Sequence, residues 1–361
     1  MKNNFDIAII GGGVAGVITA IACSEAKLKT VFFSPKVNIL GGLQIAPNAF
    51  EALQKLNCTD IISELLCSIS SIRIRDPKKL SDLAFIDLPN NYYSVNQNLF
   101  FQRLYQKVFK SDCITLKQEE IVSIEDRNDY VNCISSFGYT YNAKIIIGAD
   151  GTNGLVRRFI NGPNKVEKNF RAIRRSIIKT CSANKLLALN SINLWLGDGW
   201  HIVTYPISNG TLINTILVSE NFVPEFNFFD ESLDNFFNNI EWINIPFYKV
   251  SSKPIYHYGK IGLIGNAAHP IYPHLAQGAA QTFIDGAYLF ENLKRFGPTR
   301  EALSHYSISR QQNITKVVEL SNTAGRIMSV SGMSAKLRNL GIASNNSLIK
   351  EYIYDVWEDC F

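Results

Sequence analysis

The sequence predicts an α/β protein with a Rossmann-like nucleotide-binding domain, an inserted β-rich domain and a helical C-terminal region. Three observations support this fold class. An apolar strand runs into a glycine-rich turn and then a helix at residues 6–26, 144–157 and 259–295. Between the second and third of these units, residues 172–250 alternate β-rich segments with turns. Residues 300–328 and 334–361 are mainly helical in pattern.

The first unit carries the spacing Gly11-x-Gly13-x-x-Gly16 between a strand at residues 6–10 and a helix from Val17. In a dinucleotide site the first glycine makes the tight turn, the second lets the backbone approach a pyrophosphate, and the third packs helix on strand. The strand before the loop and the helix after it favour dinucleotide binding. A βα turn without a ligand is the alternative.

The next strand, at residues 29–33, ends at Ser34. The dinucleotide fingerprint has an acidic residue at this point, where it accepts hydrogen bonds from the ribose. A serine can form one such bond but supplies no charge. Further helices are expected at residues 49–56 and 97–109, the second beginning at Gln97.

Composition sets the broad class of the protein. The 361 residues suffice for about two domains, and 46% hydrophobic with 19% charged residues indicates a globular chain. A net charge of +5 does not match the basic face of a nucleic-acid binder. The seven cysteines are scattered without C-x-x-C pairs, so we expect reduced thiols and no metal site.

The sequence also carries expectations about location. No apolar stretch approaches the roughly 20 residues of a membrane span, although peripheral membrane contact stays open. The first strand begins within a few residues of Met1 and leaves no room for a signal peptide, so we expect a cytoplasmic protein.

Three motifs in order connect the chain with a known family. They are the glycine loop at residues 11–16, then Gly148-Ala149-Asp150-Gly151 with Arg157, and then residues 265–270 with Pro273 and residues 276–279. Together they resemble the single-component FAD-dependent aromatic hydroxylases, whose fold is that of para-hydroxybenzoate hydroxylase. The nearest branch resembles salicylate hydroxylase and 6-hydroxynicotinate monooxygenase. Similar residues at 42–48, 172–174 and 201–206 extend the resemblance over nearly the whole chain.

The resemblance implies FAD as cofactor and NADH or NADPH as co-substrate. The glycine loop would hold the FAD pyrophosphate, and Asp150 would contact FAD and favour a productive approach of NAD(P)H. The backbone of residues 277–280 would lie under the pyrimidine side of the flavin, where a helix dipole stabilises the anionic reduced form. The implied cofactor-binding residues are Gly11, Gly13, Val14, Ala15, Gly16, Ser34, Gln44, Gln97, Asp150, Asn266, Gln277, Gly278, Ala279 and Ala280.

The implied reaction is hydroxylation of a small aromatic substrate, a phenol or an aromatic acid, through a flavin hydroperoxide. Such a site must exclude water, orient the ring and favour the phenolate. His201 and Tyr205 share one face of a predicted strand, so His201 could take the phenolic proton and Tyr205 could relay or orient it. Both could instead be satisfied core residues. Pro273 would shape the loop at the flavin ring and completes the catalytic set.

Arg174 is the candidate anchor for a substrate carboxylate, because the guanidinium fork matches that group. A salt-bridged surface arginine is the alternative. The substrate-binding set is therefore Arg174, His201 and Tyr205.

Three positions depart from the family pattern. Ser34 and Asn266 stand where the family has acidic residues, and Gln97 stands where it has an arginine. Hydrogen bonds to charged groups contribute about 1.5–3 kcal/mol and neutral ones about 0.5–1.5 kcal/mol, so FAD affinity is expected to be reduced. The first hypothesis is an active hydroxylase. The alternatives are a degenerate member that binds a small molecule without turnover, and a ubiquinone-pathway hydroxylase, which also acts on phenols.

The expected organisation follows from the order of the motifs. Residues 1–70, 96–165 and 255–330 would form a discontinuous FAD-binding domain, residues 71–95 and 166–254 a β-rich substrate domain, and residues 331–361 a C-terminal helical segment. The expected partner is the small aromatic substrate. A monomer and a homodimer are both compatible with the sequence.

Overall fold

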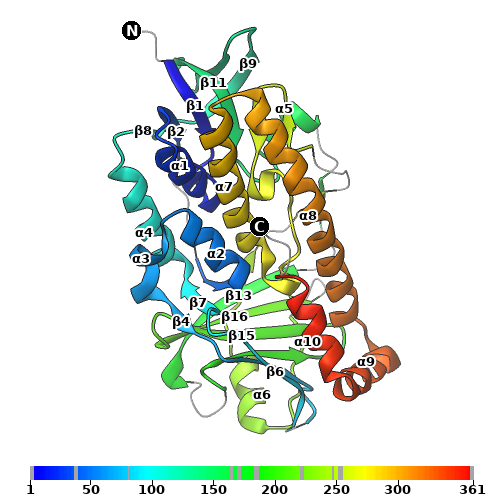
Figure 1. Cartoon of the computed structure of the whole chain (residues 1–361). Coiled ribbons are helices and arrows are strands. Elements are labelled where there is room, and N and C mark those ends of the chain that lie inside the picture. The colour runs from blue at the N-terminus through cyan, green and yellow to red at the C-terminus, as the bar shows by residue number, and fades with distance from the viewer. Residues whose placement is uncertain are drawn as a thin grey trace.

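Two large sheets form opposite ends of the molecule, and the long helix α8 runs beside both of them (Figure 1). The computed structural model describes residues 4–35, 40–79, 81–162, 166–168, 172–182, 187–219, 223–245, 248–250 and 255–357. The α/β fold class with a β-rich region and a helical C-terminal region is confirmed. The domain boundaries stay predictions, and some of them fall outside the described residues.

An eight-stranded sheet carries the three glycine turns. Its strand order is β19-β20-β11-β1-β2-β8, with β10 paired to β11 and β9 paired to β10. Strand β1 pairs in parallel with β2 and β11, and β11 pairs in parallel with β20. The strands are β1 (Asn4–Ile10), β2 (Thr30–Phe33), β8 (Ile114–Lys117), β9 (Ile121–Asp126), β10 (Val131–Ser135), β11 (Thr140–Gly148), β19 (His257–Tyr258) and β20 (Ile261–Leu263).

The parallel strands β1, β2, β11 and β20 of this sheet are largely buried and apolar because helices cover them (Figure 1). Helices α1 (Val14–Glu25) and α7 (Gln277–Phe296) pack against each other, and α1 also packs against α4 (Gln97–Phe109). The carboxyl ends of β1, β11 and β20 meet at one edge, where ligands of open α/β sheets bind. The other helices on this side are α2 (Pro47–Lys55), α3 (Thr59–Ile62) and α5 (Leu155–Asn161).

A seven-stranded sheet forms the second layer, with the order β17-β13-β16-β15-β14-β5-β6. One face packs against α6 (Glu231–Asn238) through the aromatic cluster of Trp195, Trp200, Phe226 and Phe237. The opposite face is aliphatic. The strands are β5 (Ser71–Arg75), β6 (Asp82–Asp87), β13 (Ala172–Lys179), β14 (Ser191–Leu196), β15 (His201–Ile207), β16 (Leu212–Ser219) and β17 (Ile243–Ile245).

Two small sheets complete the described strands. Strands β3 (Gly42–Ile45), β7 (Tyr93–Asn96) and β4 (Cys67–Ser68) form one of them, and β12 (Val166–Lys168) pairs with β18 (Tyr248–Val250) in the other. Strand β3 contacts the seven-stranded sheet where the Gly42 N–H donates to Asn214 Oδ1 at 2.8 Å. Strand β3 therefore bridges the two layers.

The C-terminal helices dock on the seven-stranded sheet. They are α8 (Arg300–Met328), α9 (Gly332–Ser344) and α10 (Asn346–Tyr354). Arg338 donates to the carbonyls of Leu196 and Gly197 at 3.0 and 2.9 Å, and the Tyr354 hydroxyl donates to the Asp87 carbonyl at 3.1 Å. Of the helices that the structure describes, none is long and apolar enough to span a bilayer.

Most predicted elements are present, with shifted ends. The helix at residues 97–109 is confirmed, whereas the one expected from residue 281 begins at Gln277, because Ala276 takes a left-handed φ of 54° directly before it. The region 172–250 contains α6 in addition to its strands.

Candidate functional site

A cavity of about 990 Å³ is lined by residues of the eight-stranded sheet and its turns, of the seven-stranded sheet and of the C-terminal helices. We call its two parts the nucleotide end and the apolar end. The nucleotide end is lined by residues of the glycine turns and their neighbours: Gly13, Val14, Ala15, Gln44, Gln97, Ala149, Gly151, Asn266, Pro273, Gly278 and Ala279. The apolar end is lined mainly by aliphatic residues of the seven-stranded sheet and of α8, α9 and α10, with Tyr92, Tyr352 and Trp357 among them.

The N-terminus of α1 faces the nucleotide end. Gly13 is its N-cap, no side chain caps the helix, and a Cβ placed on Gly13 would meet no protein atom within 4 Å. The N–H groups of the first turn therefore point into open space beside the positive end of the helix dipole. This arrangement fits a phosphate or pyrophosphate group.

The N-terminus of α7 faces the same cavity. Its N-cap, Ala276, has no capping side chain, and Gly278 and Ala279 line the wall. A Cβ on Gly278 would also meet open space. Two uncapped helix N-termini thus converge on one cavity and fit a cofactor that carries a pyrophosphate at one end and gains negative charge at the other.

Other predicted cofactor residues lie behind the wall. Gly11 has a φ of 121°, and a Cβ there would collide with the Ala149 carbonyl. A Cβ on Gly16 would in turn collide with the Gly11 carbonyl. These two glycines therefore allow β1, α1 and the second glycine turn to pack closely. Ala280 is fully buried in the core.

Ser34 and Asp150 also lie behind the wall. The Ser34 hydroxyl lies 2.6 Å from where a Cβ on Gly12 would be. The Asp150 Oδ2 accepts a hydrogen bond from the Val156 N–H at 2.7 Å, in the first turn of α5, and burial raises the pKa of Asp150 to about 6. The N-cap of α5 is Gly154, so Asp150 accepts this hydrogen bond from a position four residues before the helix N-cap. Its contact with FAD stays a prediction.

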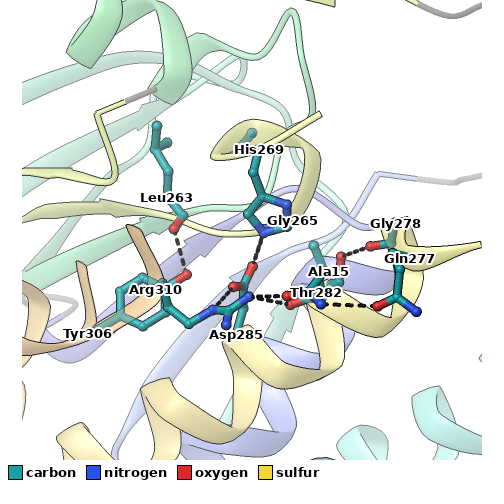
Figure 2. A network of polar contacts seen from close by, with 12 residues as sticks. Ala15, Leu263, Gly265, His269, Gln277, Gly278, Thr282, Asp285, Tyr306 and Arg310 are labelled. Atoms are coloured by element: carbon teal, nitrogen blue, oxygen red, sulfur yellow. Dashed lines mark hydrogen bonds and ion pairs between the residues drawn. The ribbon is translucent and has the colours of Figure 1, made fainter. Parts of the chain in front are cut away.

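Gln277 turns away from the cavity into a buried polar network (Figure 2). Its Oε1 accepts hydrogen bonds from Asn48 Nδ2 at 3.0 Å and Gln281 Nε2 at 3.1 Å. Gln281 Oε1 accepts from Arg310 at 2.7 Å. The network therefore extends from the first residue of α7 to α8.

Asp285 is the centre of this network (Figure 2). Its carboxylate accepts from Arg310 Nε at 2.6 Å and from the Gly265 N–H at 2.9 Å, and it lies 2.5 Å from His269 Nε2. Burial alone raises the pKa of Asp285, but the charges of His269 and Arg310 outweigh it and hold the pKa below its ordinary value. Asp285 thus fixes the third glycine turn to α7 and α8.

The structure separates the neighbours Arg174 and Arg175. Residues alternate across β13, so Ile173 and Arg175 line the cavity while Arg174 lies on the other face and donates to Ser219 Oγ at 2.8 Å. The expectation that Arg174 anchors a substrate carboxylate is therefore corrected. Arg175 instead donates to Gln97 Oε1 at 3.2 Å. The Arg175 guanidinium therefore lies beside the position where the family has an arginine and this chain has Gln97.

His201 and Tyr205 both line the cavity, as their spacing on β15 predicts. Sequence reasoning missed His274, which also lines it, with its ring centre 5.4 Å from that of His201. Burial raises the pKa of Tyr205 to about 12, although the Arg175 charge lowers it slightly. Tyr205 therefore keeps its proton at neutral pH, so its hydroxyl is able to donate a hydrogen bond to a ligand in the cavity.

The sequence comparisons agree with this geometry. The family model for glucose inhibited division protein A matches residues 6–194, more than half of the chain. A 3-hydroxybenzoate 6-hydroxylase of Aquipseudomonas alcaligenes is 25% identical over 94% of this chain and 93% of its own length. A 6-hydroxynicotinate 3-monooxygenase of Pseudomonas fluorescens is 23% identical over 89% and 91%. The chain belongs to this FAD-binding family, and its relatives show that it is similar to the aromatic hydroxylases.

Solved structures share the hydroxylase fold. The Klebsiella pneumoniae protein HpxO, complexed with FAD and uric acid, covers 98% of this chain and 96% of its own, with a TM-score of 0.84 and 14% identity. A salicylate hydroxylase substrate complex covers 100% and 99%, with a TM-score of 0.76 and 21% identity. At these identities the likeness shows the fold.

Four residues of this hydroxylase site were missed from the sequence: Arg175, His274, Asp285 and Arg310. A charged residue inside an otherwise apolar helical stretch, as at Asp285, is the one visible signal of a buried partner. The sequence around Arg175, His274 and Arg310 carries no comparable signal. Within the described ranges no group of three His, Cys, Asp or Glu residues could hold a metal ion.

Proposed function

We propose that this protein is an FAD-dependent monooxygenase that hydroxylates a phenolic ring with NADH or NADPH and O2. The observation that carries the proposal is the convergence of the α1 and α7 N-termini on one cavity, each with an open glycine in the wall. The relatives named for hydroxybenzoates and hydroxynicotinate support a hydroxylated aromatic ring as substrate. We also propose that the protein acts in the cytoplasm, as a monomer or a homodimer.

FAD would lie with its pyrophosphate at the N-terminus of α1, beside Gly13, Val14 and Ala15, and with its flavin ring between Pro273 and the Gly278–Ala279 backbone. Gln44, Gln97 and Asn266 offer polar side chains along this path. Arg175 supplies the positive charge that Gln97 lacks and so favours FAD binding over the degenerate alternative. When bound, FAD carries two electrons from NAD(P)H to O2, inserts one oxygen atom into the ring and releases the other as water.

The protein's own part is to hold and deprotonate the phenol. His201 would take the phenolic proton on its imidazole and pass it toward His274, which is less buried. Tyr205 would donate a hydrogen bond to the phenolate oxygen, since its raised pKa keeps the hydroxyl protonated. Pro273 would limit how far the ring can move at the flavin.

The test is reconstitution of the full chain with FAD, followed by NADH and NADPH oxidation with a panel of phenols under isotopically labelled O2. Substrate-stimulated oxidation with one labelled oxygen in the product is expected. His201→Asn is expected to reduce the rate of product formation by about 10²-fold or more while FAD stays bound. Tyr205→Phe removes the hydroxyl that would donate to the phenolate and is expected to slow product formation while FAD stays bound. Tyr139→Phe, at an exposed tyrosine outside the cavity lining, is its control and is expected to leave the rate unchanged. FAD binding without turnover would support the degenerate alternative, and no FAD binding would contradict the proposal.

A further inference from the structure

We infer that the substrate is a neutral phenol that carries an extended aliphatic chain, rather than a compact aromatic acid. This inference rests on the proposed function and deepens it. It follows from the walls of the apolar end, from the distribution of charge along the cavity, and from the place where the cavity reaches the surface.

The sheet wall of the apolar end is aliphatic along several strands. Every residue that β5 and β14 contribute to it is an isoleucine or leucine, and β15 and β16 add further branched side chains beyond His201 and Tyr205. A compact polar ring would leave most of this surface in contact with water. The sheet residues are Ile72, Ile74, Ile192, Leu194, Leu196, Val203, Ile216 and Val218.

The opposite wall comes from the C-terminal region and is also mainly apolar, with the aromatic side chains of Tyr352 and Trp357 among its aliphatic residues. On α10, Ile349 and Ile353 are spaced four residues apart, so both lie on the face that covers the sheet. Ala324, Ile327 and Met328 of α8 and Ile342 of α9 extend this wall. Two facing apolar walls recognise an apolar chain through burial alone.

The distribution of charged side chains along the cavity also favours a neutral substrate. Among the described lining residues, Arg175 is the one arginine or lysine, and it lies at the nucleotide end with Gln97. Arg338 approaches from α9, but it donates to the carbonyls of Leu196, Gly197 and Met328. A substrate carboxylate in the apolar end would therefore lack a charged partner, which is costly in an apolar environment.

The apolar wall continues to the surface. Ile327 and Leu348 belong to the lining and are 45% and 59% exposed. With the phenolic ring at His201 and Pro273, a chain substituent would run between the two walls toward this opening. The cavity therefore suits a chain that is longer than the ring itself.

The experiment uses the FAD-loaded full chain and 4-alkylphenols from phenol to 4-hexylphenol, with 3-hydroxybenzoate as the acidic probe. Calorimetry measures binding separately from turnover. Affinity is expected to rise by about fourfold for each CH2 group buried. 3-Hydroxybenzoate is expected to bind at least tenfold more weakly than 4-ethylphenol.

A pair of matched variants assigns the effect to the apolar end. Ile349→Gln on α10 places an amide in the wall and is expected to reduce the advantage of 4-hexylphenol over phenol by about tenfold. Ile308→Gln is the control, because Ile308 is 56% exposed on α8 and lies outside the wall. This control is expected to leave the whole series unchanged.

The outcomes separate the two proposals. Affinity that does not change with chain length, or tighter binding of 3-hydroxybenzoate than of 4-ethylphenol, would overturn the inference about the substrate while leaving the hydroxylase in place. Chain-dependent binding without NAD(P)H oxidation would support the inference and contradict the proposed function.

Discussion

Asp150 is a buried carboxylate whose protonation should affect stability. Burial raises its pKa from 3.8 to about 6. Above pH 6 the carboxylate is charged in both states, and its burial in the folded state lowers the free energy of unfolding. Near pH 3 and below, the group is mostly protonated in both states and the cost disappears. The cost therefore grows as pH rises from about 3 to 6 and is on the order of 3 kcal/mol.

The variant Asp150→Asn tests this sign. It removes the charge and keeps an oxygen that can accept from the Val156 N–H. The free energy of unfolding of the apo chain, measured in urea, is expected to rise by about 3 kcal/mol at pH 7.5 and to stay nearly unchanged at pH 3. Asp129→Asn, at an exposed aspartate, is the control. Equal changes at both pH values would rule out this account of Asp150.

Arg310 and Asp285 form a fully buried ion pair, and removing Arg310 leaves the buried Asp285 carboxylate with His269 as its remaining ionisable contact. Arg310→Met is therefore expected to lower the free energy of unfolding by about 3–5 kcal/mol. Arg326→Met, an exposed position on the same helix, should change it by no more than about 0.5 kcal/mol. Adding Asp285→Asn to Arg310→Met should recover part of the loss, because the stranded charge is then gone. If the losses of free energy of unfolding caused by Arg310→Met and Asp285→Asn were additive in the double variant, the pairing would be contradicted.

At the scale of elements, the glycines of the first turn should divide into two classes. Gly16→Ala puts a methyl group against the Gly11 carbonyl and forces α1 away from β1, so a loss of stability of more than about 2 kcal/mol is expected. Gly13→Ala meets no protein atom, and its φ of −76° suits alanine. The apo chain of this variant should therefore unfold at the wild-type temperature.

The variants Gly16→Ala and Gly13→Ala also distinguish an effect on folding from an effect on cofactor binding. The open space at Gly13 belongs to the cavity wall, so a methyl group there should weaken FAD binding by tenfold or more, as measured by flavin fluorescence. If Gly13→Ala bound FAD as tightly as wild type, the pyrophosphate would have to lie elsewhere.

Elements that depend on local chemistry could be predicted from the sequence. The helix at residues 97–109 begins after Asn96, whose side chain accepts from the N–H groups of Asn98 and Leu99 at 3.0 and 3.2 Å, and this capping signal lies within a few residues. The glycine turns are equally local. Shared strand faces could also be predicted, and His201 and Tyr205 do reach one cavity.

Features that depend on long-range packing could not be predicted from the sequence. Whether Arg174 or Arg175 faces the cavity depends on which face of β13 is turned toward it. The register of β13 in the sheet determines this, and the local sequence does not. The contact of Asp285 with Arg310 requires α7 to pack on α8. The apolar wall combines strands near residue 72 with a helix near residue 349, and no local pattern indicates that they meet.

At the scale of the whole molecule, one cavity joins three regions that are distant in sequence, so each ligand should stabilise a different part of the chain. FAD would contact the N-termini of α1 and α7, whereas an alkyl chain would contact α10. Bound ligand stabilises the folded state by RT ln(1 + [L]/Kd), about 2.7 kcal/mol at 100 times Kd. Thermal unfolding should therefore shift upward with FAD, and further with 4-hexylphenol.

Hydrogen exchange should place these effects along the chain. FAD is expected to slow exchange in the first turns of α1 and α7, and 4-hexylphenol added to the FAD-loaded chain should slow it in α10, residues 346–354. Phenol, which lacks the chain, should protect the loop around His274 without protecting α10. Protection of α10 by phenol alone would mean that the C-terminal helices respond to the ring and not to the chain, which would place the apolar substituent on another wall.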